Sequence, residues 1–170
     1  QRSKLIDILN HDVQRIERLI TDYSQILKDE VALSKEKMKK INLKLIARSV
    51  VDDFNNIYET KRGIKITLND LNNHEEYFIY GIENRIEQII ANLLDNSISF
   101  SDDNKQILVE IDKSENEKVI LKVVDEGKGF KEINTKKIFD RFYSNRPDNF
   151  GEHSGLGLNI VKNLVDLHSA

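Results

Sequence analysis

The stretch RIEQIIANLLDNSISFS, residues 85–101, decides the fold of this chain because two helical patterns are combined in it. Its apolar residues recur in steps of three and four, which places them on one face of a helix. Asn92 and Asn96 lie four residues apart and therefore share another face, opposite the apolar one. We expect a helix over residues 82–101 that packs through one side and presents two carboxamides on the other. The packing side is formed by Ile86, Ile89, Ile90, Leu93 and Leu94.

Two carboxamides on one helix face are neutral oxygen donors, which can hold a hard cation without trapping it. A magnesium ion that is shared with phosphates keeps much of its water and needs few protein ligands, so a single such oxygen suffices. Taken alone, however, a pair of asparagines is more often an ordinary exposed helix surface. The choice between the two readings depends on the rest of the chain.

The sequence DEGKGF, residues 125–130, begins a region rich in glycine. Asp125 ends an apolar strand and precedes Gly127 and Gly129. A carboxylate in this place can accept a hydrogen bond from an exocyclic amine such as that of adenine, and glycines allow the backbone to approach a ring closely. The alternative is an Asp-initiated turn, which is common. Five of the seven glycines of the chain fall within thirty-one residues: Gly127, Gly129, Gly151, Gly155 and Gly157.

The sequence GLGL, residues 155–158, is predicted to open a closing helix at about residue 156. The N-terminus of a helix offers unpaired N–H groups and a positive dipole to phosphate. Residues 131–154, which precede it, form a polar loop that is longer than a simple connection needs to be and resembles a mobile lid. This loop carries Phe139, Arg141, Phe142, Tyr143 and Arg146.

The remaining segments predict a mixed α/β domain. A short strand near residue 41 leads into a helix that stops at Gly63, and alternating residues indicate further strands. The last two strands should be neighbours, because only the polar loop SENE separates them. The predicted strands cover residues 64–68, 77–81, 106–113 and 118–126.

The first 34 residues show a different, heptad-like pattern. Apolar residues alternate steps of four and three, which is typical of a coiled coil and predicts one long helix. An ordinary core-facing helix is the alternative. A polar run then indicates a linker at residues 35–40. The apolar positions are Leu9, Val13, Ile16, Ile20, Tyr23 and Leu27.

Composition limits the possible functions. With 170 residues, the chain fits one compact domain and an appendage, and its net charge of −3 with interspersed signs argues against a nucleic-acid partner. The absence of cysteine excludes disulfides and thiolate metal sites. His74, His153 and His168 show no ligand spacing, so no zinc site is expected. Because the chain starts with Gln1 and ends within an apolar periodic stretch, we expect both ends to be internal to a longer protein.

The order of the motifs is more specific than any one of them. Asn-x-x-x-Asn, Asp-x-Gly-x-Gly, Phe-x-x-Phe and Gly-Leu-Gly-Leu follow one another as the four nucleotide-binding boxes do in sensor histidine kinases, which this chain closely resembles over residues 41–168. These kinases belong to a larger ATPase group that includes gyrase and MutL. Within the kinases, FDRFYSNRPDNFGEHSGLGL (residues 139–158) looks most like the ChvG-type subfamily.

The resemblance implies an α+β fold, namely a two-layer α/β sandwich of the Bergerat type. In it, a mixed sheet is covered by helices on one face and is preceded by a long coiled-coil-type helix. Residues 1–34 would be the second helix of a dimerisation and phosphotransfer hairpin, residues 35–40 the linker, and residues 41–170 the ATP-binding catalytic domain. The chain stops at DLHSA, before the final strands of the family fold.

The resemblance also implies ATP and Mg²⁺ as cofactors and assigns roles to single residues. Asn96 would hold magnesium and Asn92 would lie close to the phosphates, so these two are the candidate catalytic residues. Asp125 would accept the adenine amine, and Phe100 would flank the base. Ser99 replaces the Lys or Arg that the family usually has, and Arg146 or Arg141 would supply the missing charge. Lys128 stands at a position where the family varies. The remaining expected nucleotide contacts are Gly127, Gly129, Phe142, Gly155, Leu156 and Gly157.

The function implied is that of a protein-histidine kinase. In the hydrolases of the group a Glu stands at the position of Asn92 and activates water, whereas a carboxamide cannot act as a general base. His11 does not fit as phosphoacceptor, because HDVQRI lacks the Arg and Pro of the family's His-Glu-x-Arg-x-Pro box. The acceptor histidine is therefore expected before Gln1. An ATPase or serine-directed kinase of the same group, and a non-catalytic dimer scaffold, are the alternatives.

The implied partners are a second copy of the chain, through the helical hairpin, and the receiver domain of a response regulator. No nucleic acid is expected. A membrane would be reached only through segments upstream of Gln1. This places the chain in the cytoplasmic region of a bacterial inner-membrane protein.

Overall fold

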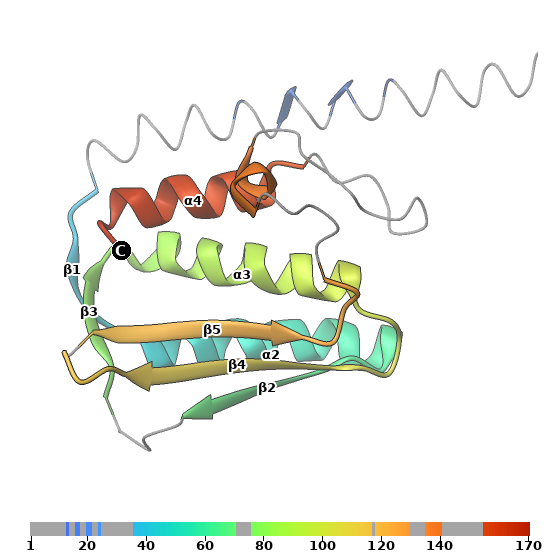
Figure 1. Ribbon diagram of the computed structural model, residues 1–170, viewed down its shortest axis with the longest axis horizontal. Coiled ribbons are helices and arrows are strands. Elements are labelled where there is room, and N and C mark those ends of the chain that lie inside the picture. Colours follow the sequence, from blue (N-terminus) through green and yellow to red (C-terminus); the bar gives the residue numbers. More distant parts are fainter. Residues whose placement is uncertain are drawn as a thin grey trace, which may run out of the picture.

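The computed structural model describes residues 13, 16, 17, 20, 21, 24, 36–70, 76–116, 118–129, 135–140 and 155–170. Helices and strands follow one another in the mixed order that the sequence predicts (Figure 1). The elements are β1 (Lys39–Asn42), α2 (Leu43–Arg62), β2 (Lys65–Asp70), β3 (Phe78–Gly81), α3 (Glu83–Phe100), β4 (Gln106–Lys113), β5 (Val119–Asp125), the 3₁₀ helix η1 (Thr135–Phe139) and α4 (Gly157–Leu167).

The main sheet is mixed, as predicted. Its strand order is β2-β4-β5, with β2 parallel to β4 and β4 antiparallel to β5. The expected pairing of the last two strands is confirmed, and Val109 lies opposite Val123 in their register. A feature that the sequence did not predict is a separate two-stranded ribbon, in which β1 pairs antiparallel with β3 and Ile41 lies opposite Ile79.

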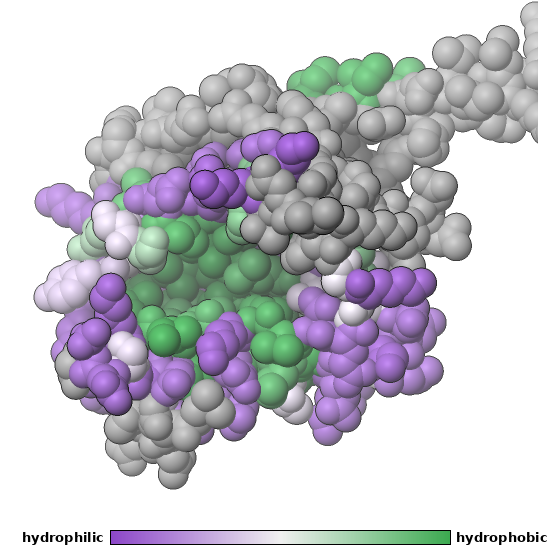
Figure 2. Space-filling model, in the orientation of Figure 1, coloured by the Kyte–Doolittle hydropathy of each residue, from purple (hydrophilic) through white to green (hydrophobic). Residues whose placement is uncertain are grey.

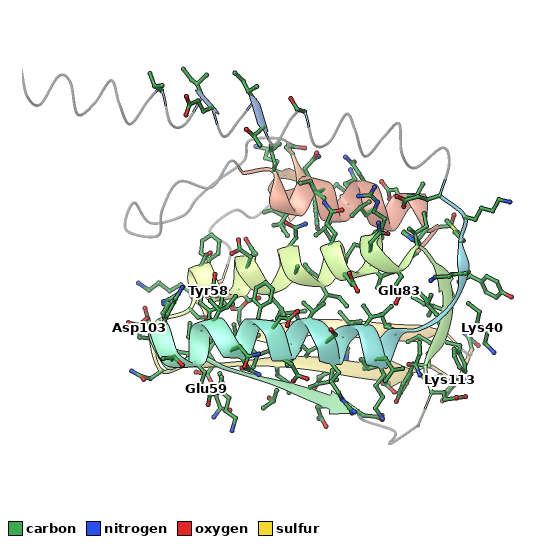
Figure 3. The ribbon with its side chains drawn as sticks, turned by 180° about the vertical axis from the view of Figure 1, so that it is seen from behind. Lys40, Tyr58, Glu59, Glu83, Asp103 and Lys113 are labelled. Atoms are coloured by element: carbon green, nitrogen blue, oxygen red, sulfur yellow. The ribbon has the colours of Figure 1, made fainter. Side chains whose placement is uncertain are left out.

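The helices form a layer on the sheet. Viewed from behind, α2 lies in front of the strands and runs along them (Figure 3), and both α2 and α3 contact strands of the main sheet. Helix α4 packs on α3 (Figure 1). The α+β sandwich expected from the sequence is therefore confirmed, and α3 lies at its centre because it contacts α2, α4 and β5.

The core is made by alternate residues of the strands and one stripe of α3. In β4, Ile107, Val109 and Ile111 are fully buried, which is the period of two expected of a strand with one packed face. Ile90 and Leu94 bring the α3 stripe onto this sheet. Two residues of the predicted packing face are less buried than the others, because Ile89 and Leu93 are only half-buried. Apolar side chains also line a hollow between α4 and β5, over α3 (Figure 2).

Both ends of α2 have local signals. Asn42 caps its start by accepting a hydrogen bond from the backbone N–H of Lys44 at 3.1 Å. Gly63 ends it in the left-handed conformation, with φ of 63°, and donates to the carbonyl of Glu59. A methyl group added at Gly63 would lie 2.2 Å from Oδ1 of Asn104, so only glycine fits here. The predicted stop at Gly63 is confirmed.

Arg62 connects the end of α2 to the end of α3. Its guanidinium donates to the carbonyl oxygens of Ile98 and Ser101 at 2.7 and 2.8 Å, and its Nε pairs with Asp103. Helix α3 has no basic residue in its own last turn, so Arg62 supplies the donors for the carbonyls that end there. These contacts stabilise the end of α3 on both sides of Phe100, the last residue of the helix.

Only six residues before Glu36 are described, and all six are helical. The side chains of Val13, Ile16 and Ile20 are 53%, 54% and 61% exposed. Because they are not packed on the domain, the core-facing alternative for this helix is disfavoured at these positions. The start of β1 at Lys39 falls inside the predicted linker of residues 35–40. His11 lies outside the described residues.

The length and the hydropathy of the described helices decide whether any of them could cross a lipid bilayer. None of them has both the length and the apolar character that a membrane-spanning helix requires.

Candidate nucleotide-binding site

The carboxamide face of α3 meets the start of α4. Asn92 donates through Nδ2 to the carbonyl of Gln88 at 2.9 Å, which leaves its Oδ1 directed away from that carbonyl. A methyl group added at Gly157 would lie 3.5 Å from this Oδ1. Gly157 is the first residue of α4, where backbone N–H groups have no partner within the helix. An oxygen acceptor and a helix N-terminus are therefore brought together, as the sequence predicts.

Asn96 lies one turn further along α3 and is half-buried. Its spacing from Asn92 within a continuous helix confirms that the two carboxamides share a face.

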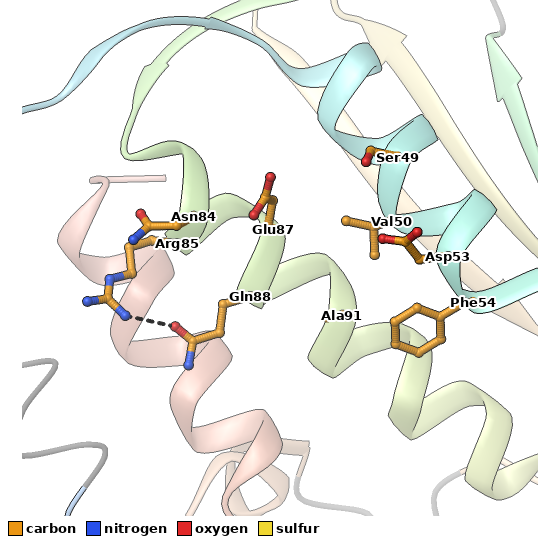
Figure 4. A pocket seen from close by; sticks show the side chains of 9 residues that line it. All are labelled: Ser49, Val50, Asp53, Phe54, Asn84, Arg85, Glu87, Gln88 and Ala91. Atoms are coloured by element: carbon orange, nitrogen blue, oxygen red, sulfur yellow. Dashed lines mark hydrogen bonds between the residues drawn. The ribbon is translucent and has the colours of Figure 1, made fainter. Parts of the chain in front are cut away.

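The three carboxylates of α3 lie in different environments. Glu83 pairs with Lys39 at 2.7 Å. Glu87 lines a pocket of about 430 Å³ between α2 and α3, together with Asp53 (Figure 4). Asp95 approaches Tyr58, which lies between α2 and α3 (Figure 3); burial first, and then the charge of Asp95, raises the pKa of Tyr58. Glu83 and Glu87 are thus separated from the face that carries Asn92, whereas Asp95 lies only three residues from Asn92 in the same helix.

The pocket between α2 and α3 contains none of the residues predicted to bind nucleotide. Its α3 side includes Arg85, whose guanidinium donates to Gln88 at 3.2 Å (Figure 4). Arg85 also pairs with Glu36 at 3.3 Å, so it joins α3 to the segment before β1. This hollow belongs to the helix–helix seam.

The end of β5 forms a turn that reaches the end of α3. Oδ1 of Asp125 accepts a hydrogen bond from the backbone N–H of Gly127 at 2.9 Å, so the predicted Asp-initiated turn is present. The turn uses one carboxylate oxygen, and the side chain is exposed. The turn and the proposed adenine acceptor are therefore compatible, because Oδ2 can still accept a hydrogen bond from a ligand.

Gly127 is required for the approach of these two segments. A methyl group added there would lie 2.8 Å from Oδ1 of Asp125 and 2.9 Å from the backbone carbonyl oxygen of Phe100. The structure thus brings Asp125, Gly127 and Phe100 together, as expected. Gly129 follows with φ of 69°, a left-handed conformation that favours glycine, and no atom of the described residues lies within 4 Å of a methyl group added there.

The start of α4 is buried and is joined to η1 by a hydrogen bond. Leu156, which precedes the helix, is 1% exposed, and Gly155 before it has φ of 69°. Asn159 is buried and donates through Nδ2 to the backbone carbonyl of Phe139 at 2.9 Å, which joins α4 to η1. Sequence reasoning missed Asn159, because no local pattern distinguishes a buried asparagine in a helix from an exposed one.

Some residues predicted to contact the nucleotide form other hydrogen bonds, are exposed, or lie outside the described residues. Ser99 is 5% exposed, and its hydroxyl donates to the carbonyl of Asp95 at 2.7 Å, within its own helix. Lys128 is exposed. The remaining candidates of the loop, Phe142 and Arg146, lie outside the described residues, as do Arg141, Tyr143, His74 and His153.

A cation at this site would have mostly neutral protein ligands. Among the residues that the structure describes, no three His, Cys, Asp or Glu side chains gather in a way that could hold a metal ion. The residues present therefore fit an ion that is held by a carboxamide oxygen and by the phosphates of a ligand, which is how Mg²⁺ binds with nucleotides.

Comparison with known proteins gives consistent results. Sensor protein ChvG of Rhizobium meliloti is 32% identical over 98% of this chain, which spans 30% of the length of ChvG. The catalytic domain of histidine kinase ThkA has the same fold, with a TM-score of 0.66 and 24% identity over 77% of this chain and 81% of its own. Full-length ShkA in complex with AMPPNP gives a TM-score of 0.64, with 22% identity over 76% of this chain and 26% of its own.

The predicted resemblance to sensor histidine kinases, and to ChvG among them, is confirmed by these similarities. Residues 81–170 match the family described as "Histidine kinase-, DNA gyrase B-, and HSP90-like ATPase". The matched region contains α3, the turn after β5 and α4, which are the elements that bring the carboxamides and the glycines together. Because it covers more than half of the 170 residues, this chain belongs to the histidine kinase-, DNA gyrase B- and HSP90-like ATPase family.

Proposed function

We propose that this chain is the ATP-binding catalytic region of a two-component sensor histidine kinase. It transfers the γ-phosphoryl group of ATP to a histidine on a helix outside residues 1–170, and the phosphoryl group then passes to an aspartate of a response regulator. The observation that carries the proposal is the position of Oδ1 of Asn92 beside the start of α4, where it would lie 3.5 Å from a methyl group added at Gly157.

ATP would lie along the face of α3, between the turn after β5 and the start of α4. Asp125 would accept a hydrogen bond from the adenine amine, and Phe100 would flank the base. Asn96 would hold Mg²⁺ against the phosphates, which would meet the N–H groups near Gly157. The presence of AMPPNP in ShkA, a protein of the same fold, supports an adenine nucleotide.

The chemistry follows from the kind of side chain beside the phosphates. Hydrolysis needs a base that takes a proton from water, and a carboxamide cannot take it. Phosphoryl transfer to a positioned nucleophile needs little more than alignment and neutralisation of charge, which a cation and backbone N–H groups supply. Asn92 and Asn96 therefore favour a kinase over an ATPase.

The partners would be a second copy of the chain and the receiver domain of a response regulator. The exposure of Val13, Ile16 and Ile20 supports pairing through the N-terminal helix, because three apolar side chains of one helix face are left uncovered. The similarity to sensor proteins supports a position in the cytoplasmic part of a bacterial inner-membrane receptor, reached through other segments of the protein.

Asp125→Asn tests adenine recognition. The change replaces a charged acceptor with an amide, and loss of a charged hydrogen bond should weaken binding by about 1–3 kcal/mol. ATP and ADP should lose affinity alike, because both contain adenine. Isothermal titration calorimetry would measure both. Glu126→Gln is the matched control, since it removes the same charge from the neighbouring exposed residue, and it should bind normally. Unchanged ADP affinity in Asp125→Asn would leave Asp125 as a turn residue only.

A second experiment tests the reaction type. The chain is expected to bind ATP yet to show neither appreciable hydrolysis nor autophosphorylation, because the carboxamide of Asn92 cannot take a proton from water and no histidine of the sequence stands in an acceptor box. His168 is unsuited as an acceptor, because both of its ring nitrogens form hydrogen bonds. A longer chain that includes the upstream helix should form acid-labile phosphohistidine outside residues 1–170. Phosphohistidine at His11, or rapid release of inorganic phosphate, would contradict the proposal.

A further inference from the structure

His168 joins the end of α4 to the beginning of α3. It is the residue that follows α4, and its ring Nδ1 lies 2.6 Å from the carbonyl oxygen of Leu164 in the last turn of that helix. Its Nε2 lies 3.1 Å from the backbone nitrogen of Ile82, which immediately precedes α3. One imidazole thus contacts two helices through both of its nitrogens, although 86 residues separate His168 from Ile82.

The two partners fix the tautomer of this ring. A carbonyl oxygen can only accept a hydrogen bond and a backbone N–H can only donate one. Nδ1 must therefore carry the proton that it donates to Leu164, and Nε2 must be the acceptor for Ile82. The bond to Ile82 satisfies a backbone N–H at the start of α3, where that helix has no side-chain cap of its own. The carbonyl of Leu164 also accepts the backbone N–H of His168 at 3.2 Å, so the ring is its second donor.

The space for the ring is provided by Gly81. A methyl group added at Gly81 would lie 3.2 Å from Cδ2 of His168 and 3.3 Å from Cδ1 of Ile41. A side chain at this position would therefore press the imidazole away from Ile82. The absence of a side chain in the last residue of β3 therefore leaves room for the imidazole in its observed position.

This contact lies at the opposite end of α4 from the nucleotide face. The two helices run antiparallel, because the end of α4 lies at Ile82 and its start lies at Asn92. At 1.5 Å per residue, the ten residues from Ile82 to Asn92 span about 15 Å, and the eleven from Gly157 to His168 span about 17 Å. Because the lengths match, the bond at His168 and the place of Gly157 beside Asn92 belong to the same register of the two helices, and the bond adds to the contacts that hold this register.

We propose that His168 is a positioning residue, which holds α4 in register on α3 so that the start of α4 reaches the phosphates of the bound nucleotide. The proposal rests on the proposed binding of ATP along α3. Its effect is confined to the phosphate end, because the adenine end is built from β5, Phe100 and the turn at Gly127, none of which contacts His168.

Two substitutions at His168 separate this role from simple stabilisation. Glutamine can place its Oε1 near the position of Nε2 and still accept from Ile82. Asparagine can place its Nδ2 near the position of Nδ1 and still donate to Leu164, but it is too short to reach Ile82. We expect His168→Asn to weaken ATP binding by about three- to tenfold, the effect of one hydrogen bond. His168→Gln should remain within about twofold of the wild type.

The measurement compares ATP with adenosine, which has no phosphate, by competition against a fluorescent nucleotide on the 170-residue chain. In His168→Asn, the affinity for ATP should fall and that for adenosine should not. Lys162→Ala, an exposed position of α4, is the control and should change neither. Circular dichroism at the assay temperature establishes that each variant is folded. A fold-wide weakening would instead lower both affinities in the same proportion.

Gly81→Ala disturbs the same contact from the β3 side and keeps the inference testable if His168→Asn does not fold. It should reproduce the selective loss of ATP affinity. If the wild-type chain binds ATP, and a folded variant of this contact keeps the wild-type ratio of ATP to adenosine affinity, the positioning role is wrong while the proposed function stands. If the wild-type chain binds no ATP, the proposed function itself fails.

Discussion

Asn96→Ala is expected to abolish magnesium-dependent ATP binding while the chain remains folded. Asn96 is half-buried on the carboxamide face of α3 and is outside the stripe of α3 that packs on the sheet. Its loss removes the protein oxygen that would hold Mg²⁺, and an ion with few protein ligands is sensitive to the removal of one. Calorimetric titration of ATP, with and without Mg²⁺, would measure the loss, and circular dichroism would show an unchanged fold.

The matched control for this experiment is Asn84→Ala. Asn84 lies on the same helix and is exposed, but it lines the seam between α2 and α3 rather than the face that meets α4. Removing an equal carboxamide there should leave ATP binding unchanged. Tight, magnesium-dependent ATP binding by folded Asn96→Ala would refute the metal assignment and would leave Asn92 as the remaining candidate on that face.

Among the substitutions proposed for this chain, Leu94→Ala is expected to cause the largest loss of stability. Leu94 has no exposed surface and belongs to the stripe of α3 that packs against the main sheet. Truncating a buried leucine to alanine removes burial and leaves a cavity, so the free energy of unfolding should fall by about 2–5 kcal/mol. Urea denaturation followed by circular dichroism would measure the change as a shift of the midpoint.

Leu45→Ala is the control for Leu94→Ala because the same atoms are removed from a helix surface. Leu45 is 60% exposed on α2, so its truncation should change the free energy of unfolding by less than about 0.5 kcal/mol. Equal effects of the two substitutions would mean that α3 does not pack through the stripe that contains Leu94. That outcome would also remove the basis for the position of the carboxamide face, since both depend on the same rotation of α3.

Much of the fold could be predicted because its signals are local. The strand QILVEIDK alternates apolar and polar residues and became β4 with the predicted limits, and the stop of α2 at Gly63 follows from a single glycine. The second sheet of β1 and β3 was not predicted. Its strands have only four residues each, which is too short for a periodic pattern to show which strand is the partner.

The candidate site was predictable to the extent that its parts are close in sequence. The turn from Asp125 to Gly127 and the shared face of Asn92 and Asn96 both follow from spacing within a few residues. Ser99 illustrates the limit. Its hydroxyl is turned to the carbonyl of Asp95 in its own helix, although its position in the motif predicts a contact with phosphate. A rotamer of this kind depends on the neighbours that surround the side chain, and these are not adjacent in sequence.

The sequence by itself determined the helix faces, the strands, the turn after β5 and the family resemblance, because each depends on backbone geometry over a few consecutive residues. Only the tertiary structure decided which groups meet across the fold. Asn92 lies beside Gly157, 65 residues later, and His168 binds the backbone at Ile82. Such contacts depend on how α4 packs on α3, and that packing is set by the sum of many side-chain contacts throughout the domain rather than by any local pattern.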